Sequence, residues 1–375
     1  MDTVLKAEKL EKVYTMGGQE VRAVDGVGNG SAAVVGDPTL EVDNTAPPPP
    51  AAPDLADEDD TGLSASDNVT NLTTGLTITG QAEAGTLVRV YVNGAEVFAI
   101  DSALFGTEGG TLSLDAGVHS ITVRAEDAVG NLSAASDPLT VTVDTAPPAA
   151  VIGTPTTGST RTGPVSFPVD FSGADAIPLG SGDIEVHATG TVAVSTAVSG
   201  GGTAGRTVSF FNASGDGELS FSLPAGAAVD TAGNPCPAVG PSAAVTVDNT
   251  PPAIPAQIDL AAEDDTGASA ADNVTAVTEG LTVTGAADVG TEVQLWVNGT
   301  KGPRLSASVF GDPGVDFSLA EGTHNIEAAA VDAAGNQSVR SPWLTVRVDT
   351  TPPSVVLGAP STTRTNTGPV TYPVT

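Results

Sequence analysis

The strongest constraint on the fold of this chain is an internal repeat that runs through almost its whole length. The segment DDTGLSASDNVT begins at Asp59 and returns as DDTGASAADNVT at Asp264, 205 residues later. The same offset relates Asp144 to Asp349, and no insertion interrupts the register. A sequence with a fixed period is built from repeated structural units, so we expect an array of similar domains.

A shorter spacing lies inside this period. The motif D-x-x-G-N begins at Asp25, Asp127, Asp230 and Asp332, at intervals of 102 or 103 residues. Each copy is followed by an apolar segment and then by an Asp-containing linker that ends in Pro-Pro. About 100 residues is the size of one immunoglobulin-like sandwich. The 205-residue period therefore contains two different domains, which we call A and B.

These repeats predict the domain boundaries. We expect a foreign or disordered head at 1–24, the end of a B domain at 25–45, an A domain at 46–145, a B domain at 146–249, an A domain at 250–350 and the start of a B domain at 351–375. The sequence stops within a domain and is interpreted as a fragment.

Composition and hydrophobic alternation both favour an all-β fold. The chain has 44 Gly, 28 Pro and only 4% aromatic residues, which disfavours long helices. A net charge of -32 raises the possibility of disorder, but 40% of the residues are hydrophobic and fall in alternating runs. Residues 87–92 (LVRVYV) alternate and precede Asn93-Gly94, which predicts a β-hairpin.

The charge excludes several classes of function. Residues 1–22 hold four of the 13 basic and four of the 45 acidic residues, which leaves 9 basic and 41 acidic residues in the rest of the chain. Such a polyanion repels nucleic acid and anionic lipid and attracts divalent cations. Cys236 is alone, so no disulfide forms within the chain, and no apolar run is long enough for membrane insertion.

The repeated motifs resemble a known family. The A pattern combines DDTGxSxxDN, VxVxxNG, GxHxxxxxxxDxxGN and VDTxPP, and it is similar to the bacterial Ig-like repeats of large surface adhesins. The B pattern, TGPVxFPV through GDGELSFSLPAGAA, resembles a second Ig-like type of the same proteins. This resemblance implies tandem immunoglobulin-like β-sandwiches in an extended array. It also implies a secreted or cell-surface location, although MDTVLKAEKLEKVY lacks the apolar core of a signal peptide.

The head is different from everything that follows it. Residues 1–26 resemble the opening strands of an ABC-transporter ATPase, in which the residue matching Tyr14 would stack on adenine. No G-x-x-x-x-G-K-S/T phosphate loop follows, so we expect no nucleotide chemistry. A spurious fusion or a mis-assigned start explains the segment better than a function does.

Acidic loops are the best candidates for a metal site. Carboxylates crowd the loop after Asp57, and calcium requires six to eight oxygen ligands. The resemblance implies calcium at the domain junctions, whereas the alternative is a solvated loop whose Asp and Asn residues only form turns. The predicted calcium ligands are Asp59, Asp60, Asp67, Asp127, Asp144, Asp264, Asp265, Asp272, Asp332 and Asp349.

Catalysis has no support in the sequence. No G-x-S-x-G or other nucleophile motif is present, and His119, His187 and His324 lack a second His or a Cys nearby, so they are interpreted as structural or exposed. We expect a structural stalk of an adhesin, packed against neighbouring Ig-like repeats, with the host or neighbouring-cell ligand bound elsewhere in the full-length protein. The alternatives are a glycan- or protein-binding Ig-like module and an accessory region of a secreted enzyme.

Overall fold

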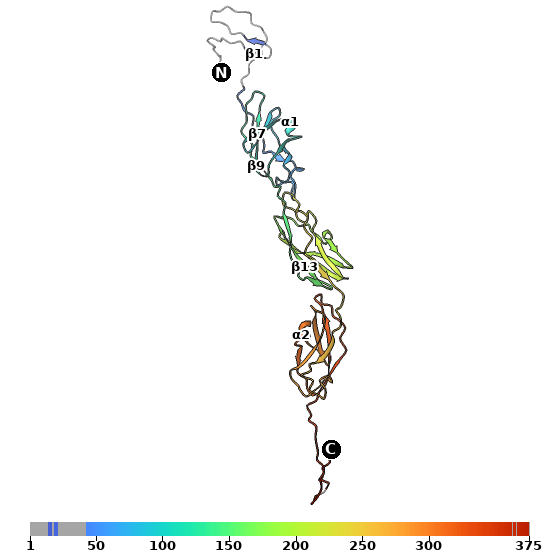
Figure 1. The fold of residues 1–375 in the computed structure, drawn as a ribbon. Coiled ribbons are helices and arrows are strands. Elements are labelled where there is room, and N and C mark those ends of the chain that lie inside the picture. Colours follow the sequence, from blue (N-terminus) through green and yellow to red (C-terminus); the bar gives the residue numbers. More distant parts are fainter. Residues whose placement is uncertain (1–13, 17–18, 22–42, 362, 365, 375) are drawn as a thin grey trace, which may run out of the picture.

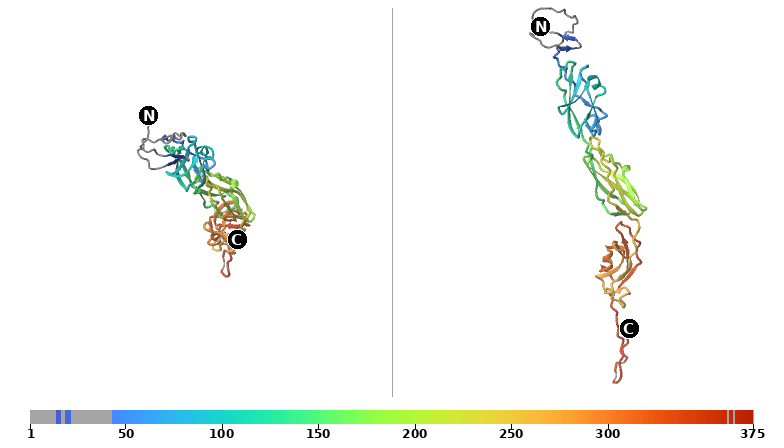
Figure 2. Two further views of the ribbon diagram at one scale, coloured as in Figure 1. Left: turned by 90° about the horizontal axis from the view of Figure 1, so that it is seen from above. Right: turned by 45° about the horizontal axis from the view of Figure 1, so that its top comes forward.

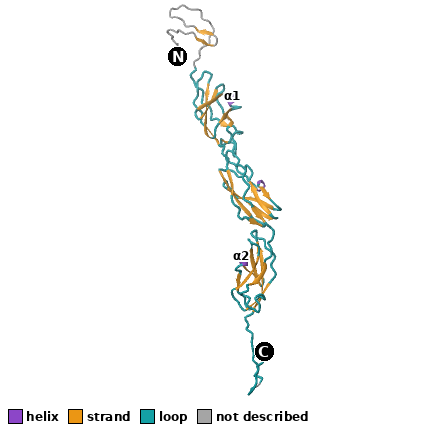
Figure 3. Ribbon diagram, viewed as in Figure 1, coloured by secondary structure: helices purple, strands orange, loops and turns teal. Residues whose placement is uncertain are grey.

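The computed structural model is an elongated row of β-sandwich domains (Figure 1). It describes residues 14–16, 19–21, 43–361, 363–364 and 366–374. Two further views show the same row from above and tilted so that its top comes forward (Figure 2). Strands and loops make up nearly all of it, and helices are confined to single short turns (Figure 3). The prediction of tandem all-β sandwiches is confirmed.

Most of the expected head and the expected end of a B domain, including Asp25 and Asn29, lie outside the described residues. The described part of this region is a two-stranded antiparallel hairpin of β1 (Tyr14–Met16) and β2 (Gln19–Val21). Tyr14, the residue of the ATPase resemblance, is in the first of these strands.

The first A domain is a sandwich of a three-stranded and a five-stranded sheet. Its elements are β3 (Asp54–Leu55), β4 (Val69–Thr70), β5 (Thr74–Thr79), β6 (Leu87–Val92), β7 (Ala95–Asp101), α1 (Ser102–Phe105), β8 (Gly110–Ser113), β9 (Gly117–Glu126) and β10 (Leu139–Val143). The sheet orders are β3-β5-β8 and β4-β10-β9-β6-β7. The predicted hairpin is β6 and β7, with Asn93 and Gly94 at positive φ in the turn.

The B domain packs two four-stranded sheets. Its elements are β11 (Ala149–Ile152), β12 (Ser159–Thr160), β13 (Val165–Ser172), η1 (Ser181–Asp183), β14 (Glu185–Ala188), β15 (Ala193–Ser199), β16 (Gly205–Ser214), β17 (Gly217–Ser222) and β18 (Val245–Val247). The sheet orders are β11-β13-β16-β15 and β12-β18-β17-β14.

The second A domain repeats the first strand for strand. Its elements are β19 (Ala256–Leu260), β20 (Val274–Thr275), β21 (Leu281–Ala286), β22 (Glu292–Val297), β23 (Thr300–Ser306), α2 (Ala307–Gly311), β24 (Val315–Phe317), β25 (Gly322–Val331) and β26 (Leu344–Val348). The sheet orders are β19-β21-β24 and β20-β26-β25-β22-β23. After it, the described residues of 351–374, which leave out 362 and 365, extend away from the sandwich (Figure 1), with an isolated bridge between Leu357 and Val374.

Each domain has its own core, because alternate residues of its strands point between the two sheets. In the first A domain, the alternating Ile121, Val123 and Ala125 of β9 are fully buried, as the pattern predicts. Phe105 of α1 closes one edge of this core and lies against Gly80, where a Cβ would come within 2.8 Å of its ring. In the B domain, Phe167, Phe210 and Phe221 form a buried aromatic cluster with ring centroids 5.1–6.0 Å apart.

None of the helices in the described part of the chain has both the length and the apolar character needed to cross a membrane.

Candidate domain-junction site

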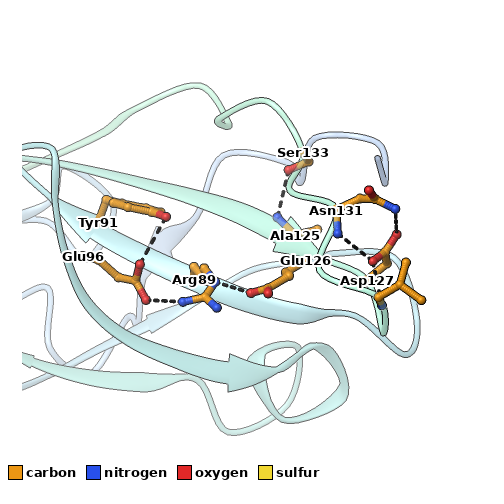
Figure 4. A network of polar contacts seen from close by, with 9 residues as sticks. Arg89, Tyr91, Glu96, Ala125, Glu126, Asp127, Asn131 and Ser133 are labelled. Carbon is orange, nitrogen blue, oxygen red and sulfur yellow. Dashed lines mark hydrogen bonds and ion pairs between the residues drawn. The ribbon is translucent and has the colours of Figure 1, made fainter. Parts of the chain in front are cut away.

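The D-x-x-G-N turn is held together by its first and last residues. In the first A domain, Asp127 Oδ1 accepts hydrogen bonds from the backbone N–H groups of Val129 and Asn131, at 2.9 and 2.8 Å. Asp127 Oδ2 accepts a further bond from Asn131 Nδ2 at 2.8 Å (Figure 4). The aspartate therefore fixes both the loop and the orientation of the asparagine amide.

That oriented amide reaches the linker before its own domain. Asn131 Nδ2 donates to the Asp43 carbonyl at 3.0 Å, Asn234 Nδ2 to the Asp144 carbonyl at 2.8 Å, and Asn336 Nδ2 to the Asp248 carbonyl at 2.8 Å. The same hydrogen bond thus occurs at three successive linkers. Asn234 and Asn336 are buried, so each bond is shielded from water.

The linker aspartate presents its carbonyl in a fixed position. The Asp144 backbone N–H donates to the Thr70 carbonyl at 2.9 Å, which extends the last strand of the first A domain by one residue. Its Oδ1 accepts from the Ala146 backbone N–H at 2.9 Å, which turns the chain toward the prolines. Asp349 makes the corresponding bonds to Thr275 and Thr351 and also pairs with Arg347 at 3.0 Å.

The acidic loop of the first A domain is closed by carboxylate-to-amide hydrogen bonds. Asp59 Oδ2 accepts from the Thr77 N–H at 2.7 Å. Asp60 is only 4% exposed and accepts from Asn68 and Val69, at 3.0 and 3.1 Å. Asp67 Oδ1 also accepts from Val69, at 3.2 Å. Dense negative charge in this loop is therefore offset by backbone N–H donors.

The second A domain repeats this loop bond for bond. Asp264 accepts from Thr282 at 2.7 Å, and Asp272 accepts from Val274 at 3.2 Å. Asp265, again buried, accepts from Asn273 and Val274 at 3.0 and 3.2 Å. The repeat in sequence is thus a repeat of loop-closing interactions.

In the first A domain the closed loop touches the B domain directly. Thr61 Oγ1 donates to the Ala232 carbonyl at 2.9 Å, and the Leu63 N–H donates to the Thr231 carbonyl at 3.1 Å. Gly62 between them has φ +100°, and a Cβ at this residue would lie 2.0 Å from the Thr231 carbonyl oxygen. Only glycine permits this approach.

The junction between the B domain and the second A domain uses an equivalent contact. Ser159 Oγ donates to the Ala333 carbonyl at 2.9 Å, and Ala333 follows Asp332 in the D-x-x-G-N turn. Ala333 has the place that Thr231 has in the turn of the B domain, and Ala232 is the next residue of that turn. Each of these two junctions therefore combines an asparagine-to-linker bond with a hydroxyl-to-turn bond.

Two aspartates of these sites have perturbed acidity, in opposite directions. Burial raises the pKa of Asp60 above its ordinary value, and the nearby charge of Asp67 adds to this effect, although the N–H groups of Asn68 and Val69 oppose it. Desolvation would also raise the pKa of Asp127. Its hydrogen bonds from Asn131, Val129 and Gly130 outweigh this and lower the pKa.

Beside the turn of the first A domain lies a small ion-pair network. Arg89 donates to Glu96 at 2.6 Å and also pairs with Glu126, which directly precedes Asp127 (Figure 4). Tyr91 contacts the other oxygen of Glu96 at 3.4 Å. These side chains lie across the outer face of the sheet and connect neighbouring strands.

The predicted calcium ligands do not come together as one ligand set. Among the residues that the structure describes, no three His, Cys, Asp or Glu side chains are placed so that they could hold a metal ion. Asp127 and Asp43 line one small hollow, and Asp59, Asp60 and Asp67 share one loop, but their oxygens face backbone N–H donors. These carboxylates serve as hydrogen-bond acceptors in the structure, and calcium binding stays a prediction.

The sequence interpretation missed two sets of junction residues. It used the asparagine of D-x-x-G-N only to mark the repeat and gave Asn131 and Asn336 no structural role, although the asparagine occurs in every copy of the motif. That recurrence is a signal that could have identified it. The contacts of Thr61 and Ser159 had no such signal, because they depend on how two different domains approach each other.

The family of the chain follows from comparison with known proteins. A family model described as a bacterial Ig-like domain matches residues 45–145 and 252–350, which together make up more than half of the chain. The chain belongs to the bacterial Ig-like domain family. The two matched bacterial Ig-like domains are the two A domains of the structure. A search of curated proteins found no match.

Several solved structures are similar to this chain. One is a structure described in connection with host cell surface retention of a 1.5-MDa bacterial ice-binding adhesin. It has 17% identity and a TM-score of 0.37, and the match covers 82% of this chain and 98% of that one. A tetra-tandem repeat from the extending region of a large adhesion protein has 17% identity, TM-score 0.25 and 87% coverage of both chains. The chicken CNTN1 FN1–FN3 domains have 12% identity, TM-score 0.29 and coverage of 81% and 99%. Likeness at this level carries no functional argument.

Proposed function

We propose that this chain is a stalk segment of a bacterial surface adhesin, in which bacterial Ig-like domains act as spacers that hold a binding region away from the cell. The observation that carries the proposal is the Asn-to-carbonyl hydrogen bond at three successive linkers. A spacer must resist bending at the points where its domains meet, and these bonds lie at those points.

Two further features support a stiff spacer. Each linker ends in two prolines, which restrict the backbone and keep the segment extended. The Gly62 contact and the Thr61 hydroxyl add a second point of attachment between the first A domain and the B domain, away from the linker. Two separate attachments between two bodies restrict rotation more than one does.

The spacer proposal is tested by small-angle scattering of the full chain. We expect the maximum dimension of an extended array, and we expect the Asn234→Ala, Thr61→Val double variant to show a shorter and broader distance distribution. Leu104→Ala, an exposed residue of α1 far from the junction, is the matched control. An array that is equally flexible with and without these side chains would contradict the proposal.

The cellular part of the proposal needs a separate measurement. Antibodies raised against the second A domain should label intact bacteria, and protease added outside the cells should remove the label. Labelling that requires permeabilised cells would contradict a surface stalk, whatever the stiffness of the array.

Calcium-dependent stiffening is a separate proposal, supported by the charge of -32 and by the family resemblance. A ligand that binds only the folded, joined state raises stability by RT ln(1 + [L]/Kd). Calcium should therefore raise the melting temperature, and the Asp264→Ala, Asp265→Ala double variant should reduce the increase. Because both residues also close a loop, the readout is the shift caused by calcium in each variant. A calorimetric titration without a site at millimolar calcium would end this proposal.

A further inference from the structure

The second A domain has a hollow that is built differently from the corresponding surface of the first. It has a volume of about 720 Å³ and lies between β19, an edge strand of one sheet, and the beginning of β26 in the other sheet. Trp343, immediately before β26, lines it and is 67% exposed. Ile254, Gln257, Asn273 and Thr345 also line it.

The hollow combines an aromatic face with free amide groups. The side chain of Gln257 and the Nδ2 of Asn273 make no hydrogen bond to any residue that the structure describes, whereas the Asn273 Oδ1 accepts from the Leu260 N–H at 3.3 Å. Amide groups of this kind can both donate and accept. A hydrophobic platform with a few convergent polar groups is the usual composition of a small-molecule site.

The first A domain lacks three of these residues at the equivalent positions, although Asn68 and Thr140 correspond to Asn273 and Thr345. Trp343 corresponds to Pro138, Gln257 to Ala52 and Ile254 to Pro49. Both tryptophans of the chain are in the second A domain. The other one, Trp296, is buried, and the guanidinium carbon of Arg340 lies 4.1 Å from its ring centroid. Trp343 therefore does not belong to the common A-domain core.

The backbone at Gln257 is also unusual. Gln257 has φ +52° and lies where the pairing of β19 with β21 shifts register between Ala256 and Asp259. The other non-glycine residues with positive φ in the described part of the chain are all asparagines, which tolerate this conformation well. Bulges and strained residues of this kind often direct a side chain toward a functional site.

Charge narrows the class of ligand. No Asp, Glu, Lys or Arg lines the hollow, although the chain as a whole carries -32. A cation would find no carboxylate there, and an anionic polymer would be repelled by the surrounding domain. A neutral ligand with both an apolar face and hydrogen-bonding groups fits these constraints. A sugar ring has this character, because its C–H face can pack on an indole while its hydroxyls reach amides.

We propose that the hollow at Trp343 binds a neutral glycan, with one sugar ring packed on the exposed indole and its hydroxyls hydrogen-bonded to Gln257 and Asn273. The second A domain would then be a spacer that also makes contact with a carbohydrate surface. This proposal does not depend on the stiffness of the array or on calcium.

The test is a titration of the full chain with a panel of neutral oligosaccharides built from hexoses and N-acetylhexosamines. Calorimetry and tryptophan fluorescence measure the binding. At least one neutral probe should bind, with a dissociation constant of roughly millimolar or tighter, as expected for a single open platform. Trp343→Ala should weaken binding by about tenfold or more, as removal of a central aromatic contact does. Gln257→Ala should weaken it by a smaller factor.

Val339→Ala is the matched control, because Val339 is in the same domain, is 69% exposed and does not line the hollow. It should leave binding unchanged, and all three variants should keep the wild-type melting temperature. The proposal is overturned if no neutral oligosaccharide binds, if Trp343→Ala binds like wild type, or if polygalacturonate or a polyproline peptide is the only probe that binds.

Discussion

The two A domains share one fold and one set of junction residues, yet their lateral surfaces have diverged. Strand order, the carboxylate-closed loop and the D-x-x-G-N turn are the same in both. By contrast, the first has Pro138 where the second has Trp343. The edge strand β7 carries Phe98 and Ala99 where β23 carries Pro303 and Arg304. Residues that join the array are thus kept the same, while residues on its sides are free to acquire different roles.

The largest expected effect tests whether the two copies unfold independently. Phe105 and Phe310 are fully buried at matching positions, and replacing either by Ala should cost its own domain about 3–5 kcal/mol. Both tryptophans lie in the second A domain, so tryptophan fluorescence follows that domain alone. Phe310→Ala should lower the urea midpoint detected by fluorescence, and Phe105→Ala should leave it nearly unchanged. Equal shifts would show that the domains unfold as one unit.

A smaller effect should distinguish the junction from the rest of the first A domain. Gly62→Ala places a methyl group against the Thr231 carbonyl, while Gly85→Ala meets nothing within 4 Å at a similar positive φ of +82°. Backbone strain should lower the free energy of unfolding of both variants by about 1–2 kcal/mol, which calorimetry measures. Only Gly62→Ala should also shorten the particle in scattering. The same shape for both variants would mean that the Gly62 contact does not hold the junction.

The two perturbed aspartates should respond to pH with opposite signs. The raised pKa of Asp60 means that its contribution to stability is present below the ordinary value of 3.8 and is lost as pH rises through the folded pKa. The stability of the Asp60→Asn variant should therefore increase relative to that of the wild type as the pH rises from about 3.8. The lowered pKa of Asp127 contributes stability above 3.8 that is lost as pH falls through the folded pKa.

Asp127→Asn should consequently be most destabilised near neutral pH and should approach wild type in acid. Urea unfolding monitored by circular dichroism between about pH 2.5 and 7 measures both differences. If both variants followed the same trend with pH, the opposite environments assigned to the two carboxylates would be incorrect.

The smallest expected effect concerns the head. Deleting residues 1–24 should leave the melting of all three complete domains unchanged, because these residues belong to no repeat and the domain cores are formed without them. Differential scanning calorimetry of the full chain and the deletion variant makes the comparison. A clear fall in any transition temperature would show that the head is a structural partner of a domain.

The sequence was sufficient to predict the sandwiches because their determinants are local. Alternation in β9 and the Asn93-Gly94 turn depend on neighbouring residues only, and the 205-residue offset shows that the units recur. The role of Asp60 was harder to predict. An acidic loop whose carboxylates accept hydrogen bonds from backbone N–H groups can have the same sequence as a loop whose carboxylates bind a cation. The hollow at Trp343 could not be predicted, since it requires the relative placement of β19 in one sheet and the beginning of β26 in the other.

The asparagine of each D-x-x-G-N turn that the structure describes in full binds a main-chain carbonyl and not a side chain of the linker. This has a consequence for how the number of repeats can evolve. Every residue type offers the same carbonyl, so a domain carrying the turn is compatible with any linker of the Asp-to-Pro-Pro type. Recombination between repeated gene segments can then add or remove a two-domain unit while leaving each boundary with its usual partner. A lineage can adjust the reach of such a protein in steps of about 205 residues without inventing a new interface.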